Sequence, residues 1–133
     1  MTAHPGLERV VTETRVAVTV AETARAVPGV CRLQPDVWGL LRQVAAEAWE
    51  RATGTELPDI GGVQVSIEHD PARPDTAVID VDISVVTDGR DHAATVARAV
   101  QHRVRAALAE ATTTAVRTIA VHITEIELAP RGR

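Results

Sequence analysis

Apolar and mostly polar side chains alternate strictly between residues 77 and 86, and this period of two constrains the fold more than any other feature. The two alternating sets are Ala77, Ile79, Val81, Ile83 and Val85 on one side, and Val78, Asp80, Asp82, Ser84 and Val86 on the other. A strand points successive side chains to opposite faces of its sheet, so the pattern predicts a half-buried strand. Residues 63–68 alternate in the same way. The polar, two-proline segment 69–75 between the two runs predicts a loop that closes an antiparallel hairpin.

Apolar residues recur with helical spacing in three other segments, at residues 7–27, 35–54 and 91–111. The first segment also shows some alternation, but its length without Gly or Pro exceeds a normal strand of about 5 to 6 residues and favours a helix. Pro35 suits the first turn of the second helix, and Gly54 suits the position just after its end. The sequence therefore predicts three amphipathic helices.

A final alternating run, residues 118–124, predicts a third strand. Its phase slips at Glu125, which indicates a bulge or the end of the strand. The predicted order is α-α-β-β-α-β, which is an α+β fold with a small, mainly antiparallel, three-stranded sheet and helices on one face. The length suits a single domain, residues 1–133, with flexible termini at 1–6 and 129–133.

The composition limits the chemistry that the chain can perform. It contains no Lys, Phe or Tyr, which excludes a P-loop, a Schiff-base mechanism and an RRM-type surface that stacks RNA bases. Of the 60 apolar residues 42 are Ala or Val, so the predicted core is thin and gains from cover by a partner subunit. The formal net charge of −4 argues against nucleic acid as a partner.

Candidate catalytic and metal-binding residues are few. Asp80 and Asp82 share one face of their predicted strand, and Glu68 and His122 are expected to face the same side. Such a group allows an oxygen-rich metal site or an acid/base site, but alternating acids are also typical of a solvated strand face, which we favour. Cys31 lacks a catalytic neighbour and is expected to be a small core residue. We therefore predict no catalytic residue, no cofactor and no metal.

Two tryptophans are the only aromatic side chains. Trp38 and Trp49 lie eleven residues apart, which places them on one side of the second predicted helix. Core packing is the first interpretation, and a protein interface anchored by tryptophan is the second. Val78 and Val86 fall on the exposed side of strand 77–86, and they support the interface hypothesis because another subunit can cover a sheet face that bears valine.

The third predicted helix carries a possible anion patch on its polar face, made of Arg98, His102 and Arg105. Such a patch can bind phosphate groups. A solvated helix face is the simpler interpretation, because Asp and Glu outnumber Arg in the whole chain.

Five short segments follow one another in a characteristic order. They are AVPGV at 26–30, GVQV at 62–65, the strand 77–86, VARAVQ at 96–101 and IAVHI at 119–123. Together they resemble the alkaline shock protein, or envelope stress response, family of Gram-positive bacteria. The use of Arg without Lys and the high Ala and Val content are typical of an actinobacterial member.

The resemblance implies a non-enzymatic cytoplasmic protein of cell-envelope homeostasis that self-associates or docks on a membrane-anchored partner. It transfers no active-site residue. We therefore expect a scaffold or adaptor that acts through a sheet edge or through the Trp38/Trp49 helix. The alternative is a small-ligand or RNA-binding module that uses the anion patch, and a salt-dependent titration would separate the two.

Overall fold

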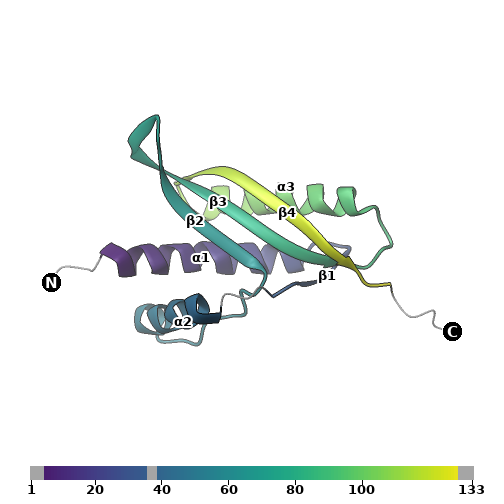
Figure 1. Cartoon of the computed structure of the whole chain (residues 1–133), viewed down its shortest axis with the longest axis horizontal. Helices are drawn as coiled ribbons and strands as arrows, with labels where there is room; N and C mark the ends of the chain where they lie inside the picture. Colours follow the sequence, from purple (N-terminus) through teal and green to yellow (C-terminus); the bar gives the residue numbers. More distant parts are fainter. Residues whose placement is uncertain (1–4, 36–38, 129–133) are drawn as a thin grey trace.

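The computed structural model describes residues 5–35 and 39–128, and within these ranges it has three helices and four strands. The elements are α1 (Pro5–Arg25), β1 (Val30–Leu33), α2 (Gly39–Thr53), β2 (Val63–Asp70), β3 (Arg73–Thr87), α3 (Ala93–Ala111) and β4 (Ala115–Ile126) (Figure 1). The predicted α+β class and the order of the six predicted elements are confirmed. One additional strand, β1, lies between the first two helices.

β3 is the central strand of the sheet. β2 and β1 pair with it antiparallel, end to end along one edge, whereas β4 pairs with it in parallel along the other edge. Two of the three strand pairings are therefore antiparallel, and the predicted hairpin of β2 and β3 is confirmed. A parallel pair needs a long connection, which α3 provides. The hairpin tip projects away from the helices (Figure 1).

The turn of the hairpin is shorter than the loop predicted at residues 69–75. Asp70 pairs with Arg73, so both strands continue into that segment. The Asp70 carboxylate accepts a hydrogen bond from the N–H of Ala72 at 3.0 Å. This local bond stabilises a tight turn, which replaces the longer loop.

β1 shows why the sequence predicted three strands and missed the fourth. It has four residues, and its pairing with β3 shifts register between Val30 and Arg32. The irregularity falls at Cys31 and removes the period of two that marks a strand. Cys31 is exposed, so its predicted place in the core is wrong.

The core lies between the sheet and the two long helices α1 and α3. The helix-facing residues of β3 are completely buried, and they are Ile79, Val81, Ile83 and Val85. The matching stripe of α3 is Val96, Val100, Val104 and Leu108. α2 packs against α1 beside this layer (Figure 1). The predicted placement of helices on one sheet face is confirmed for α1 and α3, and neither of these two helices covers the opposite face, which we call the open face.

Candidate functional site

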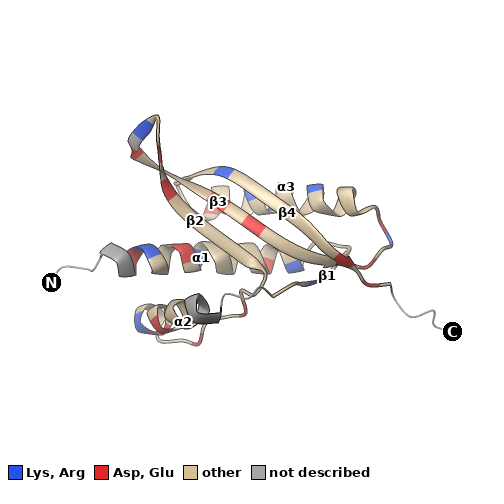
Figure 2. Cartoon of the chain, viewed as in Figure 1, with Lys and Arg blue, Asp and Glu red and all other residues tan. Residues whose placement is uncertain are grey.

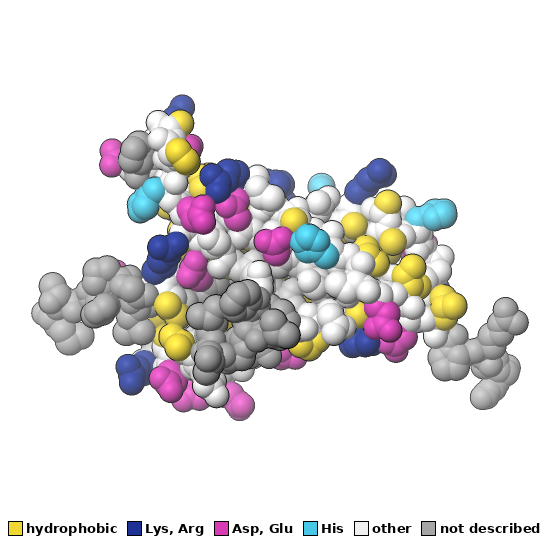
Figure 3. All heavy atoms as spheres, in the orientation of Figure 1, with side chains coloured by type: hydrophobic (Ala, Val, Ile, Leu, Met, Phe, Trp, Pro, Cys, Tyr) yellow, Lys and Arg dark blue, Asp and Glu magenta, His cyan; other side chains and the backbone are white. Residues whose placement is uncertain are grey.

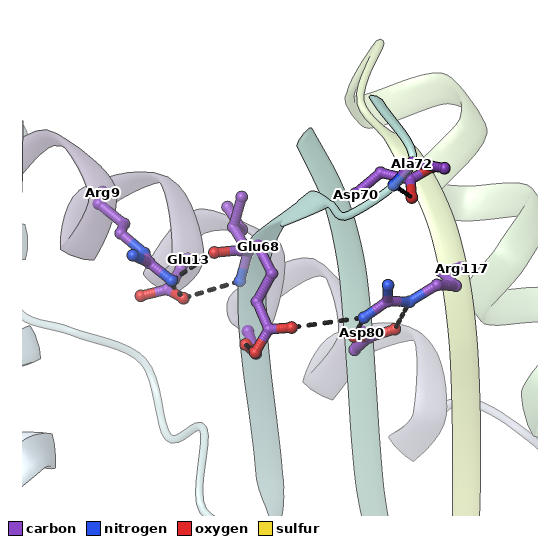
Figure 4. Close-up of polar contacts among 9 residues, drawn as sticks. Arg9, Glu13, Glu68, Asp70, Ala72, Asp80 and Arg117 are labelled. Carbon is purple, nitrogen blue, oxygen red and sulfur yellow. Dashed lines mark hydrogen bonds and ion pairs between the residues drawn. The ribbon is translucent and has the colours of Figure 1, made fainter. Parts of the chain in front are cut away.

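An arginine ties three strands together on the open face of the sheet. The register of β4 shifts beside Arg117, so this residue lies in a bulge. Its Nη2 lies 2.5 Å from Oδ2 of Asp80 on β3 and 3.4 Å from Oε2 of Glu68 on β2 (Figure 4). Hydrogen bonding to Arg117 lowers the pKa of Asp80, against partial burial, which raises it. The hydrogen bond that Arg117 donates to Asp80 likewise raises the pKa of Arg117.

A second arginine spans the sheet at its other end. Arg32 of β1, Val86 of β3 and Glu125 of β4 form one row across the sheet. Arg32 Nη2 lies 3.3 Å from Oε2 of Glu125, and Nη1 pairs with Glu127. The hydrogen bond to Glu127 raises the pKa of Arg32. We call these two arrangements the Arg117 clamp and the Arg32 clamp.

The clamps correct the prediction that Val78 and Val86 are exposed. Val78 is 6% exposed and Val86 is fully buried. Val86 lies directly under the Arg32 pair, and Val78 lies opposite Glu68, to which Arg117 reaches across β3. Arginine stems commonly cover apolar surface in this way. The two valines are therefore buried within the chain and do not present an interface.

The predicted acidic group lies on the open face, where its members pair with an arginine and a histidine. Asp80 and Glu68 bond to Arg117, and His122 Nε2 lies 2.9 Å from Oδ1 of Asp82. Acidic residues lie on the strands of this face, and acidic and basic side chains gather over it (Figures 2 and 3). Among the described residues no group of three His, Cys, Asp or Glu side chains is arranged to hold a metal ion.

The three residues of the predicted anion patch lie on one helix. Arg98, His102 and Arg105 are all exposed on α3. Arg105 donates to the carbonyl of Val116 on β4 at 3.4 Å. One of the three side chains is thus engaged at the sheet edge.

Of the two tryptophans, only Trp49 falls within the described residues, and Trp38 lies outside them. The guanidinium of Arg15 on α1 lies 5.9 Å from the centre of the Trp49 ring, which is cation–π geometry. Trp49 is half-buried, and its Nε1 is buried without a hydrogen-bond partner in the described structure. Trp49 therefore helps to join α2 to α1.

Helix side chains bond to parts of both outer edges of the sheet, which sequence patterns did not reveal. On β2, Arg9 donates to the carbonyl of Ile67, and Glu13 accepts from the Ile67 N–H at 3.0 Å (Figure 4). On β4, Gln101 donates to the carbonyl of Ile119 at 3.0 Å. These side chains occupy backbone groups that another strand would otherwise bind.

Two parts of the edges are bonded to no helix side chain among the described residues, and they expose apolar surface. The first is a cleft of about 390 Å³ between α1, α2 and the outer edge of β2, where Val44 is 52% exposed. The second is the end of β4, where Ile126 is 53% and Leu128 72% exposed. Alternation alone cannot identify these sites, because their exposure depends on which strand residues are bonded to helix side chains.

No family model and no curated protein sequence matches the chain. Among solved structures, the chain is similar to the MamM CTD carrying M250L, with a TM-score of 0.45 and 13% sequence identity. The match covers 84% of this chain and 94% of the other. A similarity at this level does not bear on function. None of the helices in the described ranges has the length and apolarity that a membrane crossing requires.

Proposed function

We propose that this protein is a non-catalytic interaction domain that self-associates through the outer edge of β4. The observation that carries the proposal is that no described helix side chain bonds to the second half of this edge strand, which ends in exposed apolar side chains. Those side chains belong to Ile126 and Leu128. A bare strand edge with apolar residues is a template for pairing with another strand.

The backbone of β4 supports this proposal. Gln101 bonds to the Ile119 carbonyl from outside the sheet. Alternate residues of a strand direct their backbone groups to the same side, so those of Val121 and Ile123 also face outward. In the described part of the chain no side chain bonds to these groups.

The charges along β4 favour a second copy of the chain as the partner that binds its outer edge. β4 carries Arg117 near its start and Glu125 near its end, followed by Glu127. Antiparallel pairing of two copies about a twofold axis brings the basic part of one strand beside the acidic part of the other. The two sheets then form one continuous sheet.

Sedimentation velocity over a range of concentrations tests self-association. We expect the mass to rise from the monomer value of 14.2 kDa toward twice that value. Ile126→Gln should raise the dimer Kd about three- to tenfold, as expected for one lost apolar contact. Val44→Gln is the matched control, because Val44 has nearly the same exposure on the other side of the sheet. A constant monomer mass at all concentrations contradicts the proposal.

We further propose, from the family resemblance, that the assembly is cytoplasmic and serves as a scaffold for a membrane-anchored partner in the envelope stress response. A deletion strain of the native host should survive envelope stress less well than the wild type. Complementation with the wild-type gene should restore survival, whereas Ile126→Gln should restore it only in part. Full survival of the deletion strain would exclude this role while leaving the self-association proposal intact.

A further inference from the structure

We infer that the cleft between α1, α2 and β2 binds an extended segment of another protein that carries aliphatic residues and at least one Lys or Arg. The cleft lies on the β2 side of the sheet, and the proposed self-association uses β4 on the opposite side. The two proposals are therefore independent.

The strand edge inside the cleft supplies hydrogen-bonding groups for such a segment. The Ile67 N–H and carbonyl point outward from β2, because Glu13 and Arg9 bond to them. Val65 lies two residues earlier in the same strand, so its N–H and carbonyl also point outward, and Val65 lines the cleft. No bond to these two groups is formed by the residues whose side chains are described, 8–35, 43–73 and 75–128. An added strand can pair with them.

The walls of the cleft are mainly apolar. They include Val10 and Ala17 of α1, Val44 and Ala45 of α2, and Ile60 before β2. A volume of about 390 Å³ accommodates a few small aliphatic side chains and lies within the usual range for binding sites. The walls therefore favour a segment rich in residues such as Val over one with large aromatic rings.

The acidic groups along the cleft select a basic segment. Glu13, Asp80 and Asp82 line it, and no arginine lines it among residues 8–35, 43–73 and 75–128, whose side chains are described. Glu13 and Asp80 already pair with Arg9 and Arg117. Asp82 is 53% exposed and bonds to His122 through Oδ1. A Lys or Arg of the bound segment can pair with Asp82.

Titration of the ¹⁵N-labelled full chain with the peptide acetyl-Val-Arg-Val-Arg-Val-amide tests the inference. We expect saturable chemical-shift changes at the amides of Val65 and Val44. The same peptide with Glu in place of Arg should bind at least about fivefold more weakly, because it repels the acidic cleft. A peptide with an N-methylated central Val should also bind more weakly, because it cannot complete strand pairing.

Val44 and Ile126 are nearly equally exposed, so Gln variants at the two positions serve as controls for each other. Val44→Gln should raise the peptide Kd about three- to tenfold and leave self-association unchanged. Ile126→Gln should leave the peptide Kd unchanged. Asp82→Asn should reduce the preference for the Arg peptide over the Glu peptide. Absence of saturable shifts up to about 5 mM peptide, shifts that map away from β2, or equal effects of the two Gln variants would overturn the inference.

Discussion

Thr87 presents a hydroxyl to the core at the end of β3. The residue is 1% exposed, and its Oγ1 has no hydrogen-bond partner within the described structure. Thr14, at 4% exposure, differs because its hydroxyl donates to the carbonyl of Val10 at 2.7 Å. A buried polar group without a partner destabilises the folded state. Thr87 follows Val85 in the inward-facing row of β3, beyond the strand predicted at 77–86, and its missing partner is visible only in the structure.

Replacement of Thr87 by Val should stabilise the protein. Val has nearly the same shape and removes the unpaired hydroxyl, so the free energy of unfolding should increase by about 1 kcal/mol. Urea unfolding followed by circular dichroism measures the change. Thr14→Val is the control, because it removes a hydroxyl that has a partner and should not stabilise. A lower unfolding midpoint for Thr87→Val would show that the hydroxyl is satisfied.

At the scale of elements, the outer strands are held to β3 by side chains as well as by backbone pairing. The Arg117 clamp joins β4 to β3 and β2, and the Arg32 clamp joins β1 to β4. Neither clamp was predicted, because each links positions far apart in the sequence. Arg117 also precedes the strand predicted at 118–124. The bulge at Arg117 interrupts the alternation, so the sequence pattern did not show that β4 begins earlier.

The Arg117 clamp predicts a dependence of stability on pH. Hydrogen bonding to Arg117 lowers the pKa of Asp80 below its ordinary value of 3.8 in the folded state. The resulting stability is present above pH 3.8 and is lost as the pH falls through the lower folded pKa. Arg117→Met keeps much of the apolar stem and removes the charge. Its urea midpoint should be below that of the wild type at pH 7, and the difference should shrink below pH 3.8.

Arg98→Met is the matched control for this pH experiment, because Arg98 is exposed and forms no ion pair among the described residues. It should leave the urea midpoint unchanged at both pH values. If the urea midpoint of Arg117→Met stays below that of the wild type by the same amount at every pH, the loss is due to packing and the electrostatic explanation is wrong.

Gly62 marks the junction where β1 and β2 meet along β3. Its φ is +91°, and a Cβ there would lie 2.8 Å from the carbonyl oxygen of Gln34. Gly62→Ala should therefore lower the free energy of unfolding by about 2 to 4 kcal/mol through backbone strain and collision. Gly54 has a φ of +72° with open space around it, so Gly54→Ala should cost only about 1 kcal/mol. Thermal unfolding compares them, and equal losses would contradict the collision argument.

For the whole molecule, local periodicity predicted the class and most of the elements but not the surfaces. Alternation correctly placed β2, β3 and their hairpin, and the phase slip at Glu125 matches the register shift after Ile123. The exposed apolar end of β4 and the cleft beside β2 depend on helix side chains that reach the sheet from distant positions. The sequence predicted that acidic residues share one face of the sheet. That Arg117 pairs with Asp80 and Glu68 on this face was found only in the structure.

In each clamp one guanidinium pairs with two carboxylates. This geometry bears on the absence of lysine from the sequence. An ammonium group is a compact point charge, whereas the planar guanidinium presents separate N–H groups to each partner. A lysine at position 117 or 32 could hold one carboxylate firmly but would release the other. At these two positions arginine is the side chain that the sheet requires, so a change that is harmless elsewhere on the surface would here loosen an edge strand.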